Sequence, residues 1–347
     1  MRTEIWHITS EGGGFHFGRH GLGQEESAIT MPSDSLFAAL INRLALRAGN
    51  AVEAFVAPFL DGEPPFALSS TFPFAGAVRF YPVPLAAVFA TGGETDAKNY
   101  KRVQYVSERL FLQLLDGKSF KEVYARAKGL SGGKALLEKD EVEGLPLAVK
   151  NGESPLWSLE TRPRVTLGRI VQNSSIYFTA RVSYARDCGL WFGVAWRSQD
   201  PARRAQVKSL WADLGDSGLG AERSVGFGVC QFKQEAEIDL PDAAGRPWIN
   251  LSRYLPRPDE SSALTWEKAA YKLVNVGGWV DTPARGGQRR RAVNLLEEGA
   301  MLGSLARPIP GALVDVRPVY PGDPDPLKHP VYRSGLALAV GWKGDLK

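Results

Sequence analysis

Segments with strand-like and helix-like apolar spacing follow one another along this chain in an order that few folds allow. After Met31-Pro32, apolar residues repeat at helical spacing, whereas from Ile176 to Tyr184 they fall on alternate positions, as in a half-buried strand. A turn at Asp187-Cys188-Gly189 predicts a hairpin between that strand and the run that ends at Trp196. In chain order, the periodic segments lie at residues 3–9, 33–44, 66–90, 176–196 (the predicted hairpin), 201–214 and 228–238.

This order reads strand, helix, strand, strand, helix, strand once residues 91–160 are set aside as an insertion. It is the ferredoxin-like split arrangement that RNA-recognition domains use. We therefore predict the α+β class, with an N-terminal ferredoxin-like domain at residues 1–240 and a second unit at residues 241–347. The second unit is rich in proline and glycine, and its clearest strand candidate runs from Ala270 to Val276.

Length and composition narrow the class of protein. A chain of 347 residues suits about two domains, and a hydrophobic content of 44% excludes disorder as a global description. No apolar run reaches the roughly 18 residues that a membrane span needs, and the first residues do not resemble an export signal. Cys188 and Cys230 lack metal-ligand spacing and fit a reducing compartment. We predict a cytoplasmic protein.

Basic residues are clustered although the net charge is only +4. From Thr161 to Arg186 there are five arginines and no acid, and from Lys98 to Lys134 nine Lys and Arg residues accompany three acids. A third cluster holds Arg285 and the arginines at 289–291. Any single cluster is most simply a solvated face, but three of them favour a polyanionic partner, because guanidinium groups suit phosphate and stack on bases.

The most specific motif is the stretch GLGAERSVGFG from Gly218 to Gly228. Its four glycines permit positive φ and close backbone approach, and successive N–H groups in such a loop can bind an anion. Arg223 and Ser224 add donors suited to phosphate oxygens. The stretch is neither a Walker loop nor a dinucleotide fingerprint, because no Gly-Lys-Ser/Thr follows and it leads into a strand. On chemistry alone, a purely structural turn explains it equally well.

The same stretch resembles the glycine-rich loop of the RAMP superfamily of CRISPR RNA-binding proteins. MPSDSLFAALI, after FHFGRHGLG, resembles one group in particular, the Cas-five-like Csm subunits of type III-A complexes, in which a Ser-Asp pair caps the first helix. RPRVTLGRIVQNSSIYFTARVSY resembles the arginine-rich approach to a central strand in that group, and HPVYR near the end is also similar. The insertion at 91–160 carries no such resemblance.

The resemblance implies tandem ferredoxin-like (RRM/RAMP) domains with a glycine-rich loop and a thumb-like insertion. It implies a subunit without catalytic residues, cofactor or metal that holds the 5′ repeat-derived tag of the CRISPR RNA. The implied partners are the large palm-polymerase subunit, the backbone RAMP subunit and, indirectly, target RNA. The residues that it places near RNA are Arg19, Ser33, Arg162, Arg164, Arg169, Gly218, Gly220, Arg223, Ser224 and Gly226.

Other interpretations stay open at this point. Asp34 could instead serve purely as a helix cap, satisfying the free N–H groups at the helix start. Tyr177 or Phe227 could stack on bases, although most aromatic residues belong to the core. His16 and His20, beside Arg19, could serve a metal-independent endoribonuclease, which needs a general base and a cation near the phosphate.

A phosphotransfer enzyme is the other rival to an RNA-binding subunit. It would need a carboxylate pair for Mg²⁺, and Asp323 and Asp325 are the one Asp-x-Asp pair in the sequence.

Overall fold

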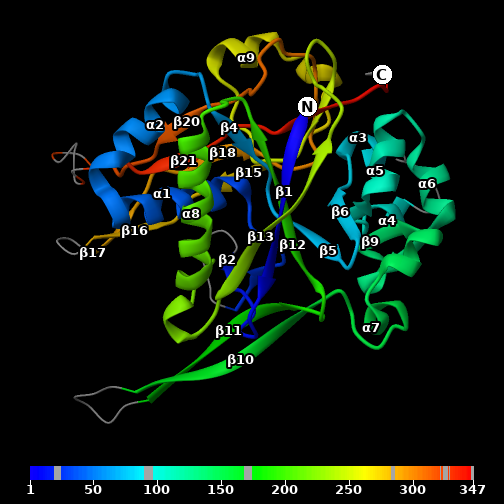
Figure 1. Ribbon diagram of the computed structural model, residues 1–347, viewed down its shortest axis with the longest axis horizontal. Helices are drawn as coiled ribbons and strands as arrows, with labels where there is room; N and C mark the ends of the chain where they lie inside the picture. Colours follow the sequence, from blue (N-terminus) through cyan, green and yellow to red (C-terminus); the bar gives the residue numbers. More distant parts are fainter. Residues whose placement is uncertain are drawn as a thin grey trace.

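A large sheet in the N-terminal two thirds of the chain organises the fold (Figure 1). The computed structural model describes residues 1–18, 25–89, 97–167, 174–282, 286–320, 322, 327 and 329–344. The elements of the N-terminal part are β1 (Arg2–Ser10), β2 (Phe17–Gly18), β3 (Ser27–Ala28), α1 (Ser33–Ala48), α2 (Val52–Leu60), β4 (Phe66–Leu68), β5 (Phe72–Ala75), β6 (Val78–Pro82), α3 (Leu85–Phe89), α4 (Ala97–Tyr100), β7 (Tyr105–Ser107), α5 (Glu108–Leu115), α6 (Phe120–Arg126), β8 (Ala127–Leu130), β9 (Ala135–Glu138), α7 (Leu147–Lys150), β10 (Trp157–Leu167), β11 (Ser174–Tyr184), β12 (Cys188–Trp196), α8 (Pro201–Ser217) and β13 (Cys230–Asp239).

One half of this sheet has the predicted split order. β1 lies between β13 and β12, and the other edge of β12 pairs with β4 and β5, all antiparallel. Helix α1 follows the first of these strands and α8 precedes the last, and the two helices lie side by side (Figure 1). Trp211 of α8 packs its ring against Phe192 and Phe232 of the sheet. The α+β class is confirmed.

A long excursion separates β5 from β12. The excursion begins at Gly76 and ends at Asp187. The backbone N–H of Gly76 donates to the carbonyl of Asp187 at 2.9 Å, so the two ends lie together. Strands β6, β7, β9 and β8 extend the same sheet, so that the described residues form a nine-stranded sheet in which β8 lies at the edge. The excursion is therefore wider than the insertion expected at 91–160.

The last part of the excursion is a two-stranded hairpin that projects from the body (Figure 1). β10 and β11 pair from Trp157–Tyr184 out to Leu167–Ser174. The predicted hairpin between residues 176–184 and 190–196 is therefore wrong, because β11 pairs with β10 whereas β12 pairs with β1, β4 and β5. The alternation in 176–184 reflects a real strand, but much of its apolar face is exposed.

The C-terminal part is built from smaller sheets and packs beside α1 and α2 (Figure 1). In the described residues, β14 pairs with β19 and β22, and the other strands form pairs, so a second four-stranded ferredoxin-like sheet stays a prediction. The predicted strand at 270–276 is shorter, Leu273–Val276. No described helix is long and apolar enough to span a bilayer. The elements of this part are β14 (Trp248–Asn250), α9 (Pro258–Ala263), β15 (Leu273–Val276), β16 (Trp279–Thr282), β17 (Gly286–Arg289), β18 (Val293–Leu296), β19 (Met301–Leu302), β20 (Leu313–Asp315), β21 (Tyr332–Ser334) and β22 (Ala339–Gly341).

Buried polar contacts join the start of α1 to the C-terminal part. Helix α1 begins at Ser33 as predicted, but neither Ser33 nor Asp34 caps it, since its N-cap is Pro32 and no side chain makes a cap hydrogen bond. The Ser33 hydroxyl accepts from the backbone N–H of Arg253 at 2.8 Å. Asp34, 1% exposed, accepts from the Arg333 guanidinium at 3.1 Å. The Ser-Asp pair thus fastens the two parts of the chain together.

We expect the Asp34–Arg333 ion pair to matter for stability. Arg333→Met leaves the Asp34 carboxylate buried without its partner, which should lower the free energy of unfolding by about 3–5 kcal/mol. Lys343→Met is the control, because its ion pair with Asp116 is well exposed and should change stability by less than about 1 kcal/mol. Urea denaturation of both variants measures the difference. Equal losses would contradict a special role for the buried pair.

Candidate functional site

Three segments that are distant in sequence meet at the root of the β10–β11 hairpin. The backbone N–H of Ala221, in the glycine-rich loop, donates to the carbonyl of His16 at 2.9 Å. The N–H of Gly228 donates to the carbonyl of Gly14 at 2.8 Å. Phe15 in turn exchanges two backbone hydrogen bonds of 2.8 Å with Val182 of β11. The loop at 218–228, the segment at 11–18 and the hairpin therefore form one unit.

Glycine is required in the loop because the backbone contacts are so close. Gly220 and Gly228 have φ values of +94° and +87°. A Cβ atom at Gly220 would lie 2.5 Å from the His16 carbonyl oxygen, and one at Gly228 would lie 2.3 Å from that of Leu219. Both distances are too short for a side chain. The loop is therefore a packed structure, with its crest as the accessible part.

The crest is a single 3-10 turn from Arg223 to Val225. Glu222 and Gly226, with φ values of 58° and 91°, lie on either side of it in the left-handed region. Arg223 and Ser224 are exposed, whereas Gly218 is buried at the foot of the loop. The Arg223 stem passes over Gly218, with its Cγ atom 3.2 Å from where a Cβ atom would lie there. The predicted donors are thus presented to solvent.

Arg164 connects the hairpin to this loop. Its guanidinium carbon lies 5.0 Å from the centre of the Phe227 ring, a cation–π distance. Its Nε atom is buried and has no hydrogen-bond partner among the described residues. Phe227 is only 4% exposed, so it supports Arg164 and is not available to stack on a base. Tyr177 lies opposite Arg164 in the strand register and is half-buried.

The register gives the hairpin two unlike faces, since residues that pair directly share a face. Arg162, Arg164 and Arg181 lie on the polar face with Glu160. Arg162 and Arg181 both bind Glu160, at 3.2 and 2.7 Å. Hydrogen bonds from Arg181, and to a smaller extent from Arg162, lower the pKa of Glu160, so its carboxylate stays ionised. The face nevertheless keeps an excess of positive charge.

The opposite face of the hairpin is apolar and accessible to solvent. Its large side chains are between 44% and 74% exposed, and they are Leu159, Val165, Leu167, Ile176 and Phe178. Isolated exposed apolar residues are ordinary, but a continuous strip on a projecting hairpin indicates an interaction surface.

The remaining predicted residues are placed differently. Ser33 is 3% exposed, and its hydroxyl already accepts the Arg253 N–H, so it lies in the buried junction between the two parts of the chain. Arg19 and Arg169 lie outside the described residues. Sequence reasoning missed Arg181 and Gly14, although Gly12-Gly13-Gly14 was a visible signal for close backbone approach. A Cβ atom at Gly14 would lie 2.6 Å from the Val182 carbonyl oxygen.

The histidines do not form a catalytic group in the part of the chain that the structure describes. His16 is 3% exposed, and its Nδ1 lies 2.7 Å from the Ala180 carbonyl. His7 stacks on Phe74, and burial lowers its pKa to about 4. His20 and the pair Asp323 and Asp325 lie outside the described residues.

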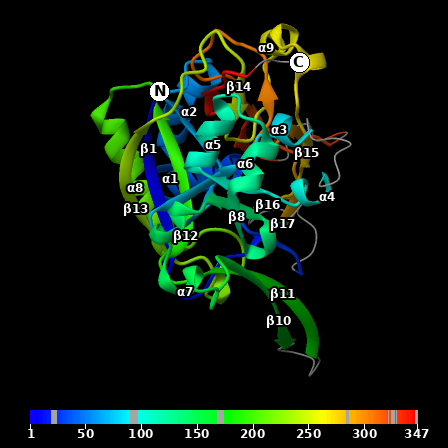
Figure 2. The ribbon, with the colours of Figure 1, turned by 90° about the vertical axis from the view of Figure 1, so that its right-hand side faces the viewer.

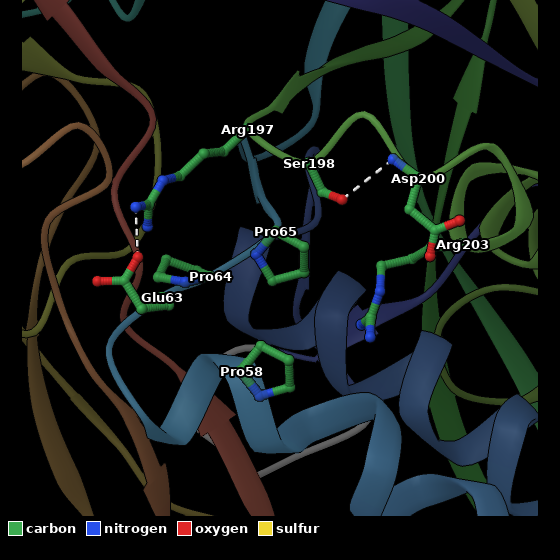
Figure 3. A pocket seen from close by; sticks show the side chains of 8 residues that line it. All are labelled: Pro58, Glu63, Pro64, Pro65, Arg197, Ser198, Asp200 and Arg203. Carbon is green, nitrogen blue, oxygen red and sulfur yellow. Dashed lines mark hydrogen bonds and ion pairs between the residues drawn. The ribbon is translucent and has the colours of Figure 1, made fainter.

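An open pocket of about 350 Å³ lies near the N-terminus of α8 (Figure 3). Its polar groups are already engaged: Arg197 pairs with Glu63, the N–H of Asp200 donates to Ser198, and Arg203 donates to the Phe55 carbonyl. The glycine-rich loop follows the other end of α8, about 25 Å away at the usual helical rise. The pocket is therefore separate from the site at the hairpin root.

Comparisons with known proteins find similarity to one kind of CRISPR subunit. Residues 243–342 match the family model of the CRISPR Csm4 C-terminal domain. The curated protein named CRISPR system Cms protein Csm4, from Thermococcus onnurineus, is 26% identical over 314 residues, which cover 89% of this chain and 90% of that protein.

Two solved structures share the fold. A chain of the Csm3–Csm4 subcomplex of the type III-A CRISPR-Cas interference complex matches 99% of this chain and 100% of its own length, with a TM-score of 0.66 and 17% identity. A chain of the Csm1–Csm4 cassette in complex with cA4 matches 99% of both chains, with a TM-score of 0.57 and 19% identity. The resemblance that the motifs indicated is thus confirmed: this chain is similar to Csm4 over 89% of its length, and residues 243–342 match the model of the Csm4 C-terminal domain.

Proposed function

We propose that this chain is a cytoplasmic, non-catalytic RNA-binding subunit of a type III-A Csm complex, and that it holds the 5′ repeat-derived tag of the CRISPR RNA. The observation that carries the proposal is the stack of Arg164 on Phe227. It joins the polar face of the hairpin to the glycine-rich loop, so that arginines from both line one continuous surface. Phosphates would bind there, and bases would lie free to be read by other groups.

The chemistry of this surface favours a flexible polyanion. Arg223 and Ser224 offer donors at the exposed crest, and the hairpin adds Arg162 and Arg164. Contacts of this kind fix the position of a backbone without reading its sequence. Tyr177, beside Arg164 in the register, is the aromatic residue placed to stack on a base.

We further propose that the chain contacts a Csm1-type large subunit and a Csm3-type backbone subunit. The support is that two solved structures of similar fold are of complexes, one of Csm4 with Csm3 and one of Csm4 with Csm1. The exposed apolar face of the hairpin adds a physical reason, since apolar strips of this kind are normally covered by a partner.

A non-catalytic role fits His7 and His16 better than the ribonuclease alternative, whose other candidate, His20, lies outside the described residues. A general base must reach the hydroxyl group that it deprotonates. His16 is enclosed and bonded to the chain, and His7 lies in the sheet against Phe74. Both positions suit packing.

Arg223→Ala should weaken binding of a tagged RNA at least tenfold, because a charge-assisted hydrogen bond contributes about 1.5–3 kcal/mol. Isotherms would be recorded with RNA that carries the 5′ repeat tag of the host array and with a scrambled tag, and the RNA would be sized afterwards. Arg246→Ala, which removes another exposed arginine, in the C-terminal part, should have little effect. Shortened RNA in the wild-type reaction would instead support the nuclease.

Arg164→Gln and Arg162→Gln remove the same charge from one face of the hairpin. We expect Arg164→Gln to have the larger effect, because Glu160 already neutralises part of the Arg162 charge and because Arg164 also supports the loop. Each lost phosphate contact should reduce the log–log salt slope of binding by about 0.7. Titrations at several salt concentrations measure both slopes. A larger loss for Arg162→Gln would contradict the proposed surface.

A further inference from the structure

A second glycine-rich turn lies in the excursion, in the sequence KGLSGGK from Lys128 to Lys134. It connects β8 to β9, and β8 is the edge strand of the sheet. Ser131, Gly132 and Gly133 all have positive φ, at 49°, 69° and 83°, and Lys134 then returns to the right-handed region. Such a change of hand turns successive backbone N–H groups toward one side, which is the geometry of an anion-binding concavity.

Cations surround this turn. The Arg102 Nη2 atom lies 3.6 Å from where a Cβ atom of Gly132 would be. The N–H groups of Gln104 and Tyr105 both donate to the Lys134 carbonyl, at 2.8 and 3.0 Å, so the segment that contains Lys101 and Arg102 runs beside the turn. Lys128 is exposed on the adjacent edge strand. Lys101, Arg102, Lys128 and Lys134 therefore lie on chain segments that meet at this turn.

Few acids oppose these charges. Between residues 97 and 137 the sequence holds Glu108, Asp116 and Glu122. The next acids, at 138–143, follow the end of β9 that lies away from the turn, where Glu138 and Asp140 bind Arg109. Glu108 accepts from Arg79 and Tyr81, and Asp116 binds Lys343, so both are engaged elsewhere. Within the described part of the chain, Lys101, Arg102, Lys128 and Lys134 make no ion pair with one another or with any acid. The region keeps its positive charge.

The turn also has a hydroxyl group without a hydrogen-bond partner, and open space beside one of its glycines. The Ser131 hydroxyl has no hydrogen-bond partner among the described residues, although its oxygen is shielded from solvent. A Cβ atom at Gly133 would meet nothing within 4 Å, so a ligand can approach the backbone there. A hydroxyl group, turned backbone and several cations are the donors that bind a phosphate group.

The composition of the region distinguishes between a nucleic acid and a protein partner. Among the described residues, none of the exposed large apolar side chains lies in 97–107 or 126–136. Protein interfaces are depleted in lysine and enriched in aromatic residues, which is the opposite of this pattern. We infer that Lys101, Arg102, Lys128, Lys134 and the Ser131–Gly133 turn form a second RNA-contacting surface, which binds phosphates of the RNA backbone.

This surface is separate from the one at the hairpin root. In the sheet order, β13, which follows the glycine-rich loop, and β8 are the two ends, seven strand spacings apart. At about 4.8 Å per spacing the ends are separated by about 34 Å along the sheet. In Figure 2 the excursion, with α4, α6 and β8, faces the viewer. An RNA bound at both surfaces would have to cross the molecule.

The test uses the full chain and a single-stranded RNA of about 30 nucleotides, which is about 100 Å long even when its bases stack. The variant Lys101→Gln/Arg102→Gln/Lys134→Gln removes three charges from the surface. We expect its Kd to rise at least tenfold and its log–log salt slope to fall by about 2, the sum of three phosphate contacts. Ser131→Ala alone should cause a smaller rise in Kd without changing the slope.

The control variant Arg2→Gln/Lys233→Gln/Lys268→Gln removes the same charges from exposed positions on β1, on β13 and beside α9. It should bind RNA as the wild-type chain does. Equal losses in both triple variants would reduce the effect to net charge and overturn the inference. Unchanged binding by the excursion variant would overturn it as well.

The inference builds on RNA binding but not on the tag site, so the two can fail separately. If Arg223→Ala abolishes tag binding while the excursion variant binds normally, the proposed function stands and the second surface is rejected. If the excursion variant alone loses affinity, the second surface stands and the hairpin-root site is rejected. Amide hydrogen exchange gives an independent readout, because RNA should slow exchange at residues 128–134 in the wild-type chain and not in the excursion variant.

Discussion

The structure depends on backbone contact that is possible only where a side chain is missing. The loop at 218–228 lies so close to residues 13–16 that a Cβ atom at Gly220 would meet the His16 carbonyl oxygen, and one at Gly13 would meet that of Gly226. That proximity lets main-chain groups of the two segments bond directly, and Phe15 then passes the connection on to β11. These hydrogen bonds help to position the root of the hairpin and with it Arg162, Arg164 and Arg181. Phosphate-binding side chains are useful only when their supports are rigid, and the glycines provide that rigidity.

A second constraint holds the two parts of the chain together. Asp34 and Arg333 are 299 residues apart and are both buried. Arg253 donates its backbone N–H to Ser33 and lies 3.1 Å from Glu298, whose carboxylate also accepts from Ser70. Buried charges are costly unless they are paired, so this junction tolerates few other arrangements. The C-terminal part is therefore fixed against α1 by chemistry and not by a linker.

Local patterns in the sequence predicted the helices and strands well, but they predicted poorly which strands pair and which distant side chains meet. The helices that begin at Ser33 and at Pro201 and the position of the glycine-rich loop followed from spacing and turn residues. The strand that pairs with β11 could not be predicted in this way, because a strand has the same alternating sequence whether its apolar face meets a core or solvent. The role of Ser33 and Asp34 was missed for a related reason: a helix start predicts capping, whereas the groups that bind them, Arg253 and Arg333, lie more than 200 residues away. The Arg164–Phe227 stack likewise joins segments that no local rule connects.

The two unlike faces of the β10–β11 hairpin have a consequence for the chain before it meets any other molecule. In a free copy of the chain, a strip of large apolar side chains on a projecting pair of strands is exposed to solvent. Such surfaces are recognised by chaperones and by aggregating chains. Copies made in excess of whatever covers this strip would be removed by proteolysis or lost to aggregation. The exposed hairpin would then limit the abundance of the free chain. The number of surviving copies would match the number that assemble with a partner.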